Sequence, residues 1–281
     1  MKKWIGIALV AAVAVLAIWV IRENKTLECT VYSIDDPNLP EEFDGFRIAQ
    51  VSDLHSAQFG EKNGQLLQCI SQGRPDVIVL TGDIIDSRRL DIPVALEFVR
   101  EAVQIAPVYC VTGNHEARIS EYAVLRDGLE EAGAVVLENE KCTIARQGAS
   151  ITMLGIHDPS FPADPIEGDE AAVTARRIAD LQDLQDGYTV LLSHRPELFE
   201  TYVKENIDLA FTGHAHGGQI IIPFLRQGIF APHQGFFPKY TEGMHEKDGT
   251  VMVVSRGLGN SSFPFRIFNR PELIEVTLTK K

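Results

Sequence analysis

Apolar runs of four or five residues alternate along the first half of the chain with segments of helical spacing. The runs predict strands at 47–51, 77–80 and 108–111. The helical spacing predicts helices at 63–71, 94–103 and 121–132. Because strands that alternate with helices of this length form βαβ units, the pattern predicts an α/β fold with a largely parallel sheet.

The second half of the chain is richer in strand patterns. These patterns lie at 141–145, 150–154, 189–192, 209–211, 219–222, 251–254 and 273–278. One helix with an Ala-rich face is predicted near 171–184, and no repeat, low-complexity tract or long linker interrupts the pattern. We therefore expect one soluble domain at 45–281, preceded by a short linker and first strand at 23–44 and by an N-terminal anchor at 1–22.

The N-terminal segment is apolar and uncharged from Ile5 to Ile21. As a helix these 17 residues span about 25 Å, which is enough for the core of a bilayer. Trp4 and Trp19 lie near the two ends, where interfacial rings belong. A cleaved signal peptide is the alternative, but the run exceeds the usual ~7–15 apolar residues and no small-x-small cleavage site follows it. The prediction is an uncleaved single-pass anchor in the cell membrane.

The charges beside the anchor give a small bias in orientation. Lys2, Lys3 and the α-amino group lie on one side, and Arg22 and Lys25 on the other. This favours an N-terminus inside the cell and places the soluble domain outside the cytoplasm.

Composition excludes some classes of protein. Hydrophobic residues make up 45% and charged residues 23%, as in packed globular proteins. The formal net charge of -13 disfavours nucleic acid as the main partner, because such binding needs clustered Lys and Arg. Cys69 and Cys110 lie in apolar patterns and are interpreted as core thiols, whereas Cys29 and Cys142 could in principle pair.

Side chains that bind metals or move protons gather where the predicted strands end. They form five groups: Asp53-x-His55, Asp83-x-x-Asp86, Asn114-His115, His194 and His214-x-His216. Each group alone is common turn chemistry. Ligands of open α/β sheets bind beyond the carboxyl ends of the strands, and five such placements in order are hard to attribute to chance. The sequence therefore predicts one site at this edge.

The donor types indicate which metals the site would take. Carboxylates, imidazoles and one amide oxygen suit manganese, iron or zinc better than calcium or copper(I). Seven metal donors among these nine side chains are too many for one tetrahedral zinc. They fit two ions about 3.5–4 Å apart, which can act together on a phosphoryl group. We expect two divalent metal ions, with manganese preferred and iron, zinc or magnesium as alternatives.

The ordered motifs D-x-H, G-D-x-x-D, G-N-H-E, H and G-H-x-H resemble those of the calcineurin-like metallophosphoesterases, over roughly residues 46–276. Segments 213–219, 232–240, 255–259 and 269–272 are similar to the membrane-associated bacterial branch related to the YkuE and YaeI phosphoesterases. The resemblance implies a four-layer α/β/β/α sandwich and a metal-dependent hydrolase of phosphoric ester bonds.

The resemblance also implies a role for each matching residue. Seven residues would hold the metals: Asp53, His55 and His216 on one ion, Asn114, His194 and His214 on the other, and Asp83 between the two. His115 would protonate or polarise the leaving oxygen, and Asp86 would orient His115.

The function that these features imply is a membrane-anchored phosphodiesterase acting by direct attack of a metal-bridging hydroxide on a small-molecule, phospholipid or lipid-linked substrate. The alternatives are a UDP-2,3-diacylglucosamine-type pyrophosphate hydrolase, which requires a cytoplasmic site, a phosphomonoesterase, and a non-catalytic binding module. Ser87 stands where protein Ser/Thr phosphatases of this superfamily carry Arg, which disfavours phosphoprotein substrates. The oligomeric state stays open.

Loops 223–238 and 263–265 are unusually apolar. They either pack on the sandwich or form an apolar rim that accepts an acyl chain or rests on the bilayer. Four cations near these loops and the motifs are candidate phosphate contacts: Arg195, Lys239, Arg256 and Arg266.

Overall fold

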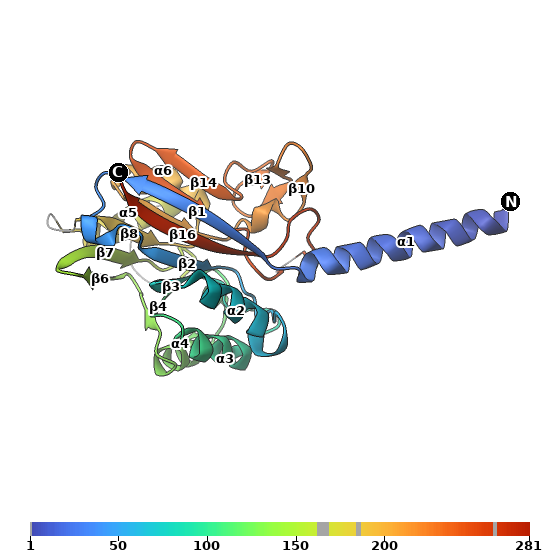
Figure 1. Ribbon diagram of the computed structural model, residues 1–281, viewed down its shortest axis with the longest axis horizontal. Helices are drawn as coiled ribbons and strands as arrows, with labels where there is room; N and C mark the ends of the chain where they lie inside the picture. The colour runs from blue at the N-terminus through green and yellow to red at the C-terminus, as the bar shows by residue number, and fades with distance from the viewer. Residues whose placement is uncertain (1, 162–168, 184–186, 261–262) are drawn as a thin grey trace.

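A computed structural model describes residues 2–161, 169–183, 187–260 and 263–281. One long helix, α1 (Lys2–Lys25), projects away from a body that is built around two six-stranded sheets (Figure 1). Helix α1 continues three residues beyond the predicted anchor boundary at residue 22. Among the described residues it is the one helix long and apolar enough to cross a membrane, by length and composition.

The first sheet contains most of the predicted βαβ units. Its strands are β1 (Glu28–Asp36), β2 (Arg47–Val51), β3 (Val77–Thr81), β4 (Val108–Val111), β5 (Val135–Val136) and β16 (Glu272–Lys280). They lie in the order β1-β16-β2-β3-β4-β5, and β2 to β5 are parallel. The apolar runs predicted β2, β3 and β4, whereas the two-residue β5 was not predicted. Strand β16 returns from the C-terminus, antiparallel to β2 and parallel to β1.

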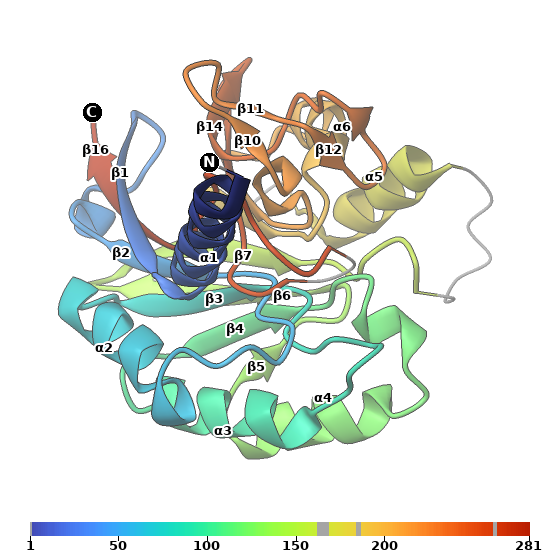
Figure 2. The same ribbon diagram turned by 90° about the vertical axis from the view of Figure 1, so that its right-hand side faces the viewer.

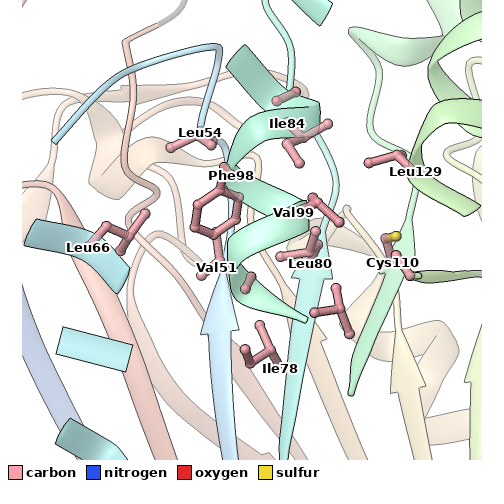
Figure 3. Close-up of a cluster of buried hydrophobic side chains, with 14 of the residues drawn as sticks. Val51, Leu54, Leu66, Ile78, Leu80, Ile84, Phe98, Val99, Cys110 and Leu129 are labelled. Carbon is pink, nitrogen blue, oxygen red and sulfur yellow. The ribbon is translucent and has the colours of Figure 1, made fainter. Parts of the chain in front are cut away.

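Three helices cover the outer face of this sheet: α2 (Gly64–Gly73), α3 (Ile92–Ala102) and α4 (Tyr122–Glu131). Figure 3 shows the core between them, where Leu66, Phe98 and Leu129 pack with Leu80 and Cys110 of the strands. Burial of this apolar face is the main force that fixes helices of this length on a sheet.

The second sheet packs behind the first. Its strands are β6 (Glu140–Arg146), β7 (Ala149–Gly155), β8 (Thr189–Leu192), β9 (Leu209–Thr212), β14 (Gly243–Lys247) and β15 (Thr250–Val254), in the order β14-β15-β9-β8-β7-β6. Apolar side chains of the two sheets, such as Val79 and Phe211, fill the space between them. Helices α5 (Glu170–Leu181) and α6 (Phe199–Lys204) cover the outer face (Figure 2). The predicted four-layer α/β/β/α sandwich is confirmed.

The remaining elements are short. Two small hairpins form after β9, from β10 (Ile221–Ile222), β11 (Gln227–Gly228), β12 (Phe230–Ala231) and β13 (Gly235–Phe236). Single 3-10 turns lie at Glu41–Phe43, Glu61–Asn63, Glu116–Arg118, Pro196–Leu198 and His216–Gly218.

Some elements differ from the sequence expectation. The strand predicted at 219–222 reduces to the two residues of β10, and the helix predicted at 171–184 ends at Leu181, with Leu184 outside the described residues. Strand β14 and helix α6 were not predicted, because β14 is polar and half exposed and α6 is too short for its periodicity to register.

The disulfide between Cys29 and Cys142, which the sequence left open, does not form. All four cysteines are free, and Cys29 on β1 lies in a different sheet from Cys142 on β6. Cys29 instead neighbours Cys69 of α2, and burial together with that thiol raises the pKa of Cys29. Cys110 is buried in the core, as predicted.

Candidate active site

Five strand ends from the two sheets meet at one edge of the sandwich and bring the predicted site residues together. Strands β2, β3 and β4 supply one half of the site, and β8 and β9 the other. Every residue of the five predicted groups is buried here: Asp53, His55, Asp83, Asp86, Asn114, His115, His194, His214 and His216.

One group of donors consists of Asp53, His55 and His216. The Nε2 atoms of the two histidines lie 3.2 Å apart. Asp53 Oδ1 lies 3.4 Å from His216 Nε2 and 3.9 Å from His55 Nε2. The three side chains therefore converge on a space of the size that a metal ion takes.

A second group of donors lies beside the first. His194 Nε2 is 3.3 Å from Asp83 Oδ2 and 3.2 Å from His214 Nδ1. The side-chain oxygen of Asn114 faces His214 Nδ1 at 2.8 Å. Asp83 Oδ2 is also 3.7 Å from His55 Nε2, so this carboxylate stands between the two groups.

The hydrogen-bond pattern fits two bound cations. His194 Nδ1 contacts the carbonyl oxygen of Thr81 at 2.7 Å, which places a proton on Nδ1 and leaves Nε2 facing Asp83. The side-chain oxygen of Asn114 and Nδ1 of His214 face each other, and both are acceptors. A 180° turn of the amide would relieve this contact, and so would a cation between the two atoms. The donor set of imidazole, carboxylate and amide suits divalent transition metals.

The backbone around the site is strained. Five of the predicted ligands have positive φ, and they come from three different loops: Asp53, His55, Asp83, His214 and His216. Such conformations cost about 1–3 kcal/mol each and persist where the surrounding structure enforces them. Gly82 and Gly113 permit the close approach of the Asp83 loop and the loop that carries Asn114, since a Cβ on Gly82 would lie 2.6 Å from the backbone nitrogen of Gly113. The strained backbone lowers the stability of the fold and directs these side chains into the site.

Glu116 holds the Asp83 loop and the Asn114 loop together, a role that nothing in the sequence beyond the G-N-H-E motif indicates. Its carboxylate accepts hydrogen bonds from the backbone nitrogens of Asp83 at 2.9 Å and Gly113 at 2.7 Å, and from Ile85 at 3.3 Å. Burial, followed by the charge of Asp83, raises the pKa of Glu116 to about 8. Glu116 is a positioning residue for the loops that carry Asp83 and Asn114.

His115 lies next to both groups of donors. Its Nε2 is 4.0 Å from Asp83 Oδ2, while its Nδ1 lies 3.5 Å from Asp86 Oδ1 and accepts the backbone N–H of Ser87 at 3.0 Å. Asp86 therefore acts on His115 mainly through charge, because the nearer hydrogen bond comes from Ser87. Burial lowers the pKa of His115, and Asp83 and Asp86 oppose that shift.

Charges within the site differ sharply between its histidines. Burial lowers the pKa of His216 to about 4 and holds those of His55 and His214 well below their usual value, so these rings are neutral and able to bind metal. Burial opposes charge on His194 as well, but Asp83 outweighs it and raises the pKa of His194 to about 10.

We predict that metal binding displaces a proton from His194. A metal ligand must be unprotonated, so metal loading at pH 7 releases about one proton per chain. Below the pKa of His194, the apparent metal affinity rises about tenfold for each unit by which the pH is raised. Calorimetric titration with manganese in two buffers of different ionisation enthalpy measures the released proton. An affinity that does not change with pH, together with heats that do not depend on the buffer, would contradict this assignment.

A pocket of about 530 Å³ opens beside the two groups of donors. Its lining contains the basic and titratable side chains of Arg88, Arg118, His115 and His233. It also contains five apolar side chains, which we call the apolar wall: Ile220, Ile229, Phe230, Phe236 and Phe263. A pocket lined by both kinds of side chain fits a phosphoester that carries an apolar substituent.

His233 was not predicted as a site residue. Its Nδ1 lies 2.7 Å from Arg195 Nη1 and 2.9 Å from His214 Nε2. Arginine is always a donor, so Nδ1 of His233 accepts and the ring carries its proton on Nε2. His233 therefore braces His214, a contact between residues that stand 19 apart in the chain.

The four cations predicted as phosphate contacts do not line the pocket. Arg195 is buried against Asp158, and Arg256 pairs with Glu272 at 2.8 Å. Arg266 donates to the backbone oxygens of Arg256 and Gly259, and Lys239 lies over the ring of Tyr240. The structure favours the alternative that each is a surface or structural cation, because each has a partner away from the pocket.

Comparison with known proteins agrees with this geometry. A family model described as calcineurin-like phosphoesterase matches residues 46–218, which is more than half of the chain. The fold and the buried His/Asp clusters are those expected of a metal-dependent phosphoester hydrolase. The chain belongs to the calcineurin-like phosphoesterase family and is an enzyme of that class.

The relatives place the chain within the predicted branch. It is 30% identical over 266 residues to the metallophosphoesterase YkuE of Bacillus subtilis, covering 91% of this chain and 87% of that protein. It is 25% identical over 240 residues to the phosphodiesterase YaeI of Escherichia coli, covering 83% and 82%. The crystal structure of TT1561 of Thermus thermophilus has the same fold, with a TM-score of 0.51 and 16% identity over 76% of this chain and 90% of that chain.

Proposed function

We propose that the protein is a membrane-anchored phosphodiesterase that works with two divalent metal ions, manganese preferred. The observation that carries this proposal is the position of Asp83, whose Oδ2 lies between His55 at 3.7 Å and His194 at 3.3 Å. When bound, the two ions supply Lewis acidity at phosphorus and acidify a water that attacks it directly. The overall reaction adds water across one P–O bond and gives a phosphomonoester and an alcohol.

The side chains of the site divide the remaining work. His115 lines the pocket and donates the proton of its Nε2 to the oxygen that leaves, while Asp86, 3.5 Å from its Nδ1, orients the ring. Arg88 and Arg118 line the same wall and neutralise the phosphate oxygens. Glu116 and His233 keep the loops and the His214 ring in place.

A diester fits the pocket better than a monoester. A monoester carries a second negative charge and needs more cationic contacts, whereas two arginines face this pocket from the described residues. The apolar side chains of the same pocket give the second ester group a place to bind.

Helix α1 supports the proposed anchor. Most of its apolar side chains are exposed, and Ile5, Val10 and Ile18 are all more than half exposed. Exposure of a whole helix of this composition is stable in lipid and unfavourable in water. The charge bias of the flanking lysines and arginines supports a catalytic domain outside the cytoplasm.

The test is hydrolysis by the full-length protein, loaded with manganese, of two chromogenic esters that share a leaving group. We expect p-nitrophenyl ethyl phosphate, a diester, to be hydrolysed faster than p-nitrophenyl phosphate, a monoester. Turnover that favours the monoester would contradict the diester preference, and turnover unchanged by a chelator would contradict the metal mechanism.

A further inference from the structure

The two apolar loops, 219–240 and 263–268, form an exposed surface that we call the aromatic rim. Part of these loops packs on the sandwich, as one interpretation of the sequence expected, since Ala231 and Tyr240 are buried. The large apolar side chains at the tips of the loops are exposed instead. Phe224 is fully exposed, with a relative accessibility of 103%, and Leu225, Phe236 and Phe237 are exposed by 72%, 74% and 64%. Soluble proteins rarely leave so many large apolar side chains together in water, so this surface has a partner.

The rim is continuous with the end of α1. The Trp19 ring of α1 lies 5.0 Å from the ring of Phe268. Asn24 Oδ1 accepts from the backbone nitrogen of Arg266 at 2.7 Å, and Asn24 Nδ2 donates to its carbonyl oxygen at 3.0 Å. Glu23 pairs with Arg270 at 2.7 Å. Three contacts in the last two turns therefore fix the helix against this loop.

The direction of α1 decides what the rim faces. The hairpins that carry β10 and β13 lie on the side of the body from which α1 leaves (Figure 1), and they stand beside the helix when it is viewed end-on (Figure 2). If α1 crosses a bilayer, the rim comes to the membrane surface at the level of Trp19, where aromatic side chains are favoured.

The charge of the rim also fits a bilayer. The chain has a net charge of -13, yet no Asp or Glu occurs between Asp208 and Glu242. Within that stretch the rim carries Lys239 and Arg226, and Arg226 pairs with Glu242 at 2.7 Å. Apolar side chains with a flanking cation and few carboxylates are the pattern of surfaces that bind lipid.

The rim leads directly into the active-site pocket. Phe230, Phe236 and Phe263 belong both to the rim and to the apolar wall of the pocket. An amphiphile in the outer layer of lipid could therefore place its acyl chain on this wall while its phosphate reaches the arginines and the donor clusters.

We propose that the aromatic rim contacts the lipid bilayer and that the substrates are amphiphilic phosphodiesters taken from it. This inference rests on the proposed function, because it needs both the anchor and phosphodiester hydrolysis. It goes further by naming the surface that meets the membrane and the class of substrate that the surface admits.

Contact with lipid is tested by fluorescence in the full-length chain. Trp4 and Trp19 are the only tryptophans, so Trp4→Phe and Trp19→Phe give a background without tryptophan. Phe224→Trp or Phe237→Trp then reports on the rim, and Val124→Trp on the exposed face of α4 is the matched control. The protein is reconstituted in phosphatidylcholine–phosphatidylglycerol vesicles with brominated acyl chains.

We expect bromine to quench the two rim tryptophans and to leave the α4 tryptophan unquenched. Protein that floats with the vesicles while its rim tryptophans stay unquenched would overturn the inference and leave the proposed anchor intact. Protein that does not float with vesicles would overturn the anchor and the inference together. Quenching does not depend on turnover, so an inactive preparation still decides the question of contact.

Substrate class is tested with one leaving group on two diesters. The change Phe224→Ser/Phe237→Ser alters exposed side chains that do not line the pocket. We expect it to lower kcat/KM for p-nitrophenyl dodecyl phosphate in vesicles by about tenfold or more, because apolar contact area is lost, and to leave kcat/KM for p-nitrophenyl ethyl phosphate in water unchanged. An equal effect on both esters, or none on either, would overturn the proposal.

Discussion

Asp83→Asn abolishes the binding of at least one of two metal ions and reduces diester hydrolysis by about 10³-fold or more. The proposal makes this carboxylate the bridge between the two donor groups, and loss of metal-assisted catalysis costs several kcal/mol, where each 1.4 kcal/mol is tenfold in rate. The measurement is metal content per chain by mass spectrometry, made on the same sample as the rate.

The control for this variant is Asp127→Asn, the same chemical change at an exposed position of α4 that pairs only with its neighbour Arg126. It should keep both metals and the full rate. Two metals per chain in Asp83→Asn would show that Asp83 does not bridge them.

His115→Ala has the second largest expected effect and leaves metal content unchanged. Removal of a general acid costs about 10²–10⁴ in kcat. The loss should be large for an alkyl leaving group, which must be protonated as it departs, and small for nitrophenolate, which departs without a proton. Steady-state rates on two diesters that differ only in the leaving group measure this contrast.

His245→Ala serves as the control, because His245 lies on β14 and bonds the carbonyl oxygen of Glu242, away from the pocket. Equal losses for both leaving groups in His115→Ala would assign His115 to binding or structure. Metal loss in that variant would place His115 among the ligands.

The strand ends of the site could be predicted because each follows a buried apolar run. Val77–Thr81, for example, is buried along its whole length, and Asp83 must then emerge where the sheet ends. The same reasoning holds for Asn114 after β4 and for His214 after β9. Local periodicity and sheet geometry are sufficient for such residues.

Residues that depend on tertiary partners could not be predicted in this way. Arg195 looks like a free cation in the sequence, but its guanidinium is paired with Asp158, 37 residues away in the chain. His233 braces His214 from a loop with no periodicity, and Arg118 faces the pocket from a single 3-10 turn. Burial and pairing decide these roles, and both arise only on folding.

The exposure of the aromatic rim also could not be predicted from the sequence. The apolar composition of 223–238 is plain in the sequence, but a chain pattern does not distinguish a loop that packs from one that is exposed. The structure shows Phe224 and Phe237 without cover and attaches the neighbouring loop to α1 through Asn24. Exposure and the contact with α1 together carry the membrane hypothesis.

The central claim is that two metal ions, shared through Asp83, perform phosphodiester hydrolysis. Its most direct test is a titration of metal-free, full-length protein with manganese while hydrolysis of p-nitrophenyl ethyl phosphate is followed. The account predicts that activity rises steeply only as the second equivalent binds and reaches a plateau at two per chain. Full activity at one equivalent, or activity without added metal in the presence of a chelator, would contradict it.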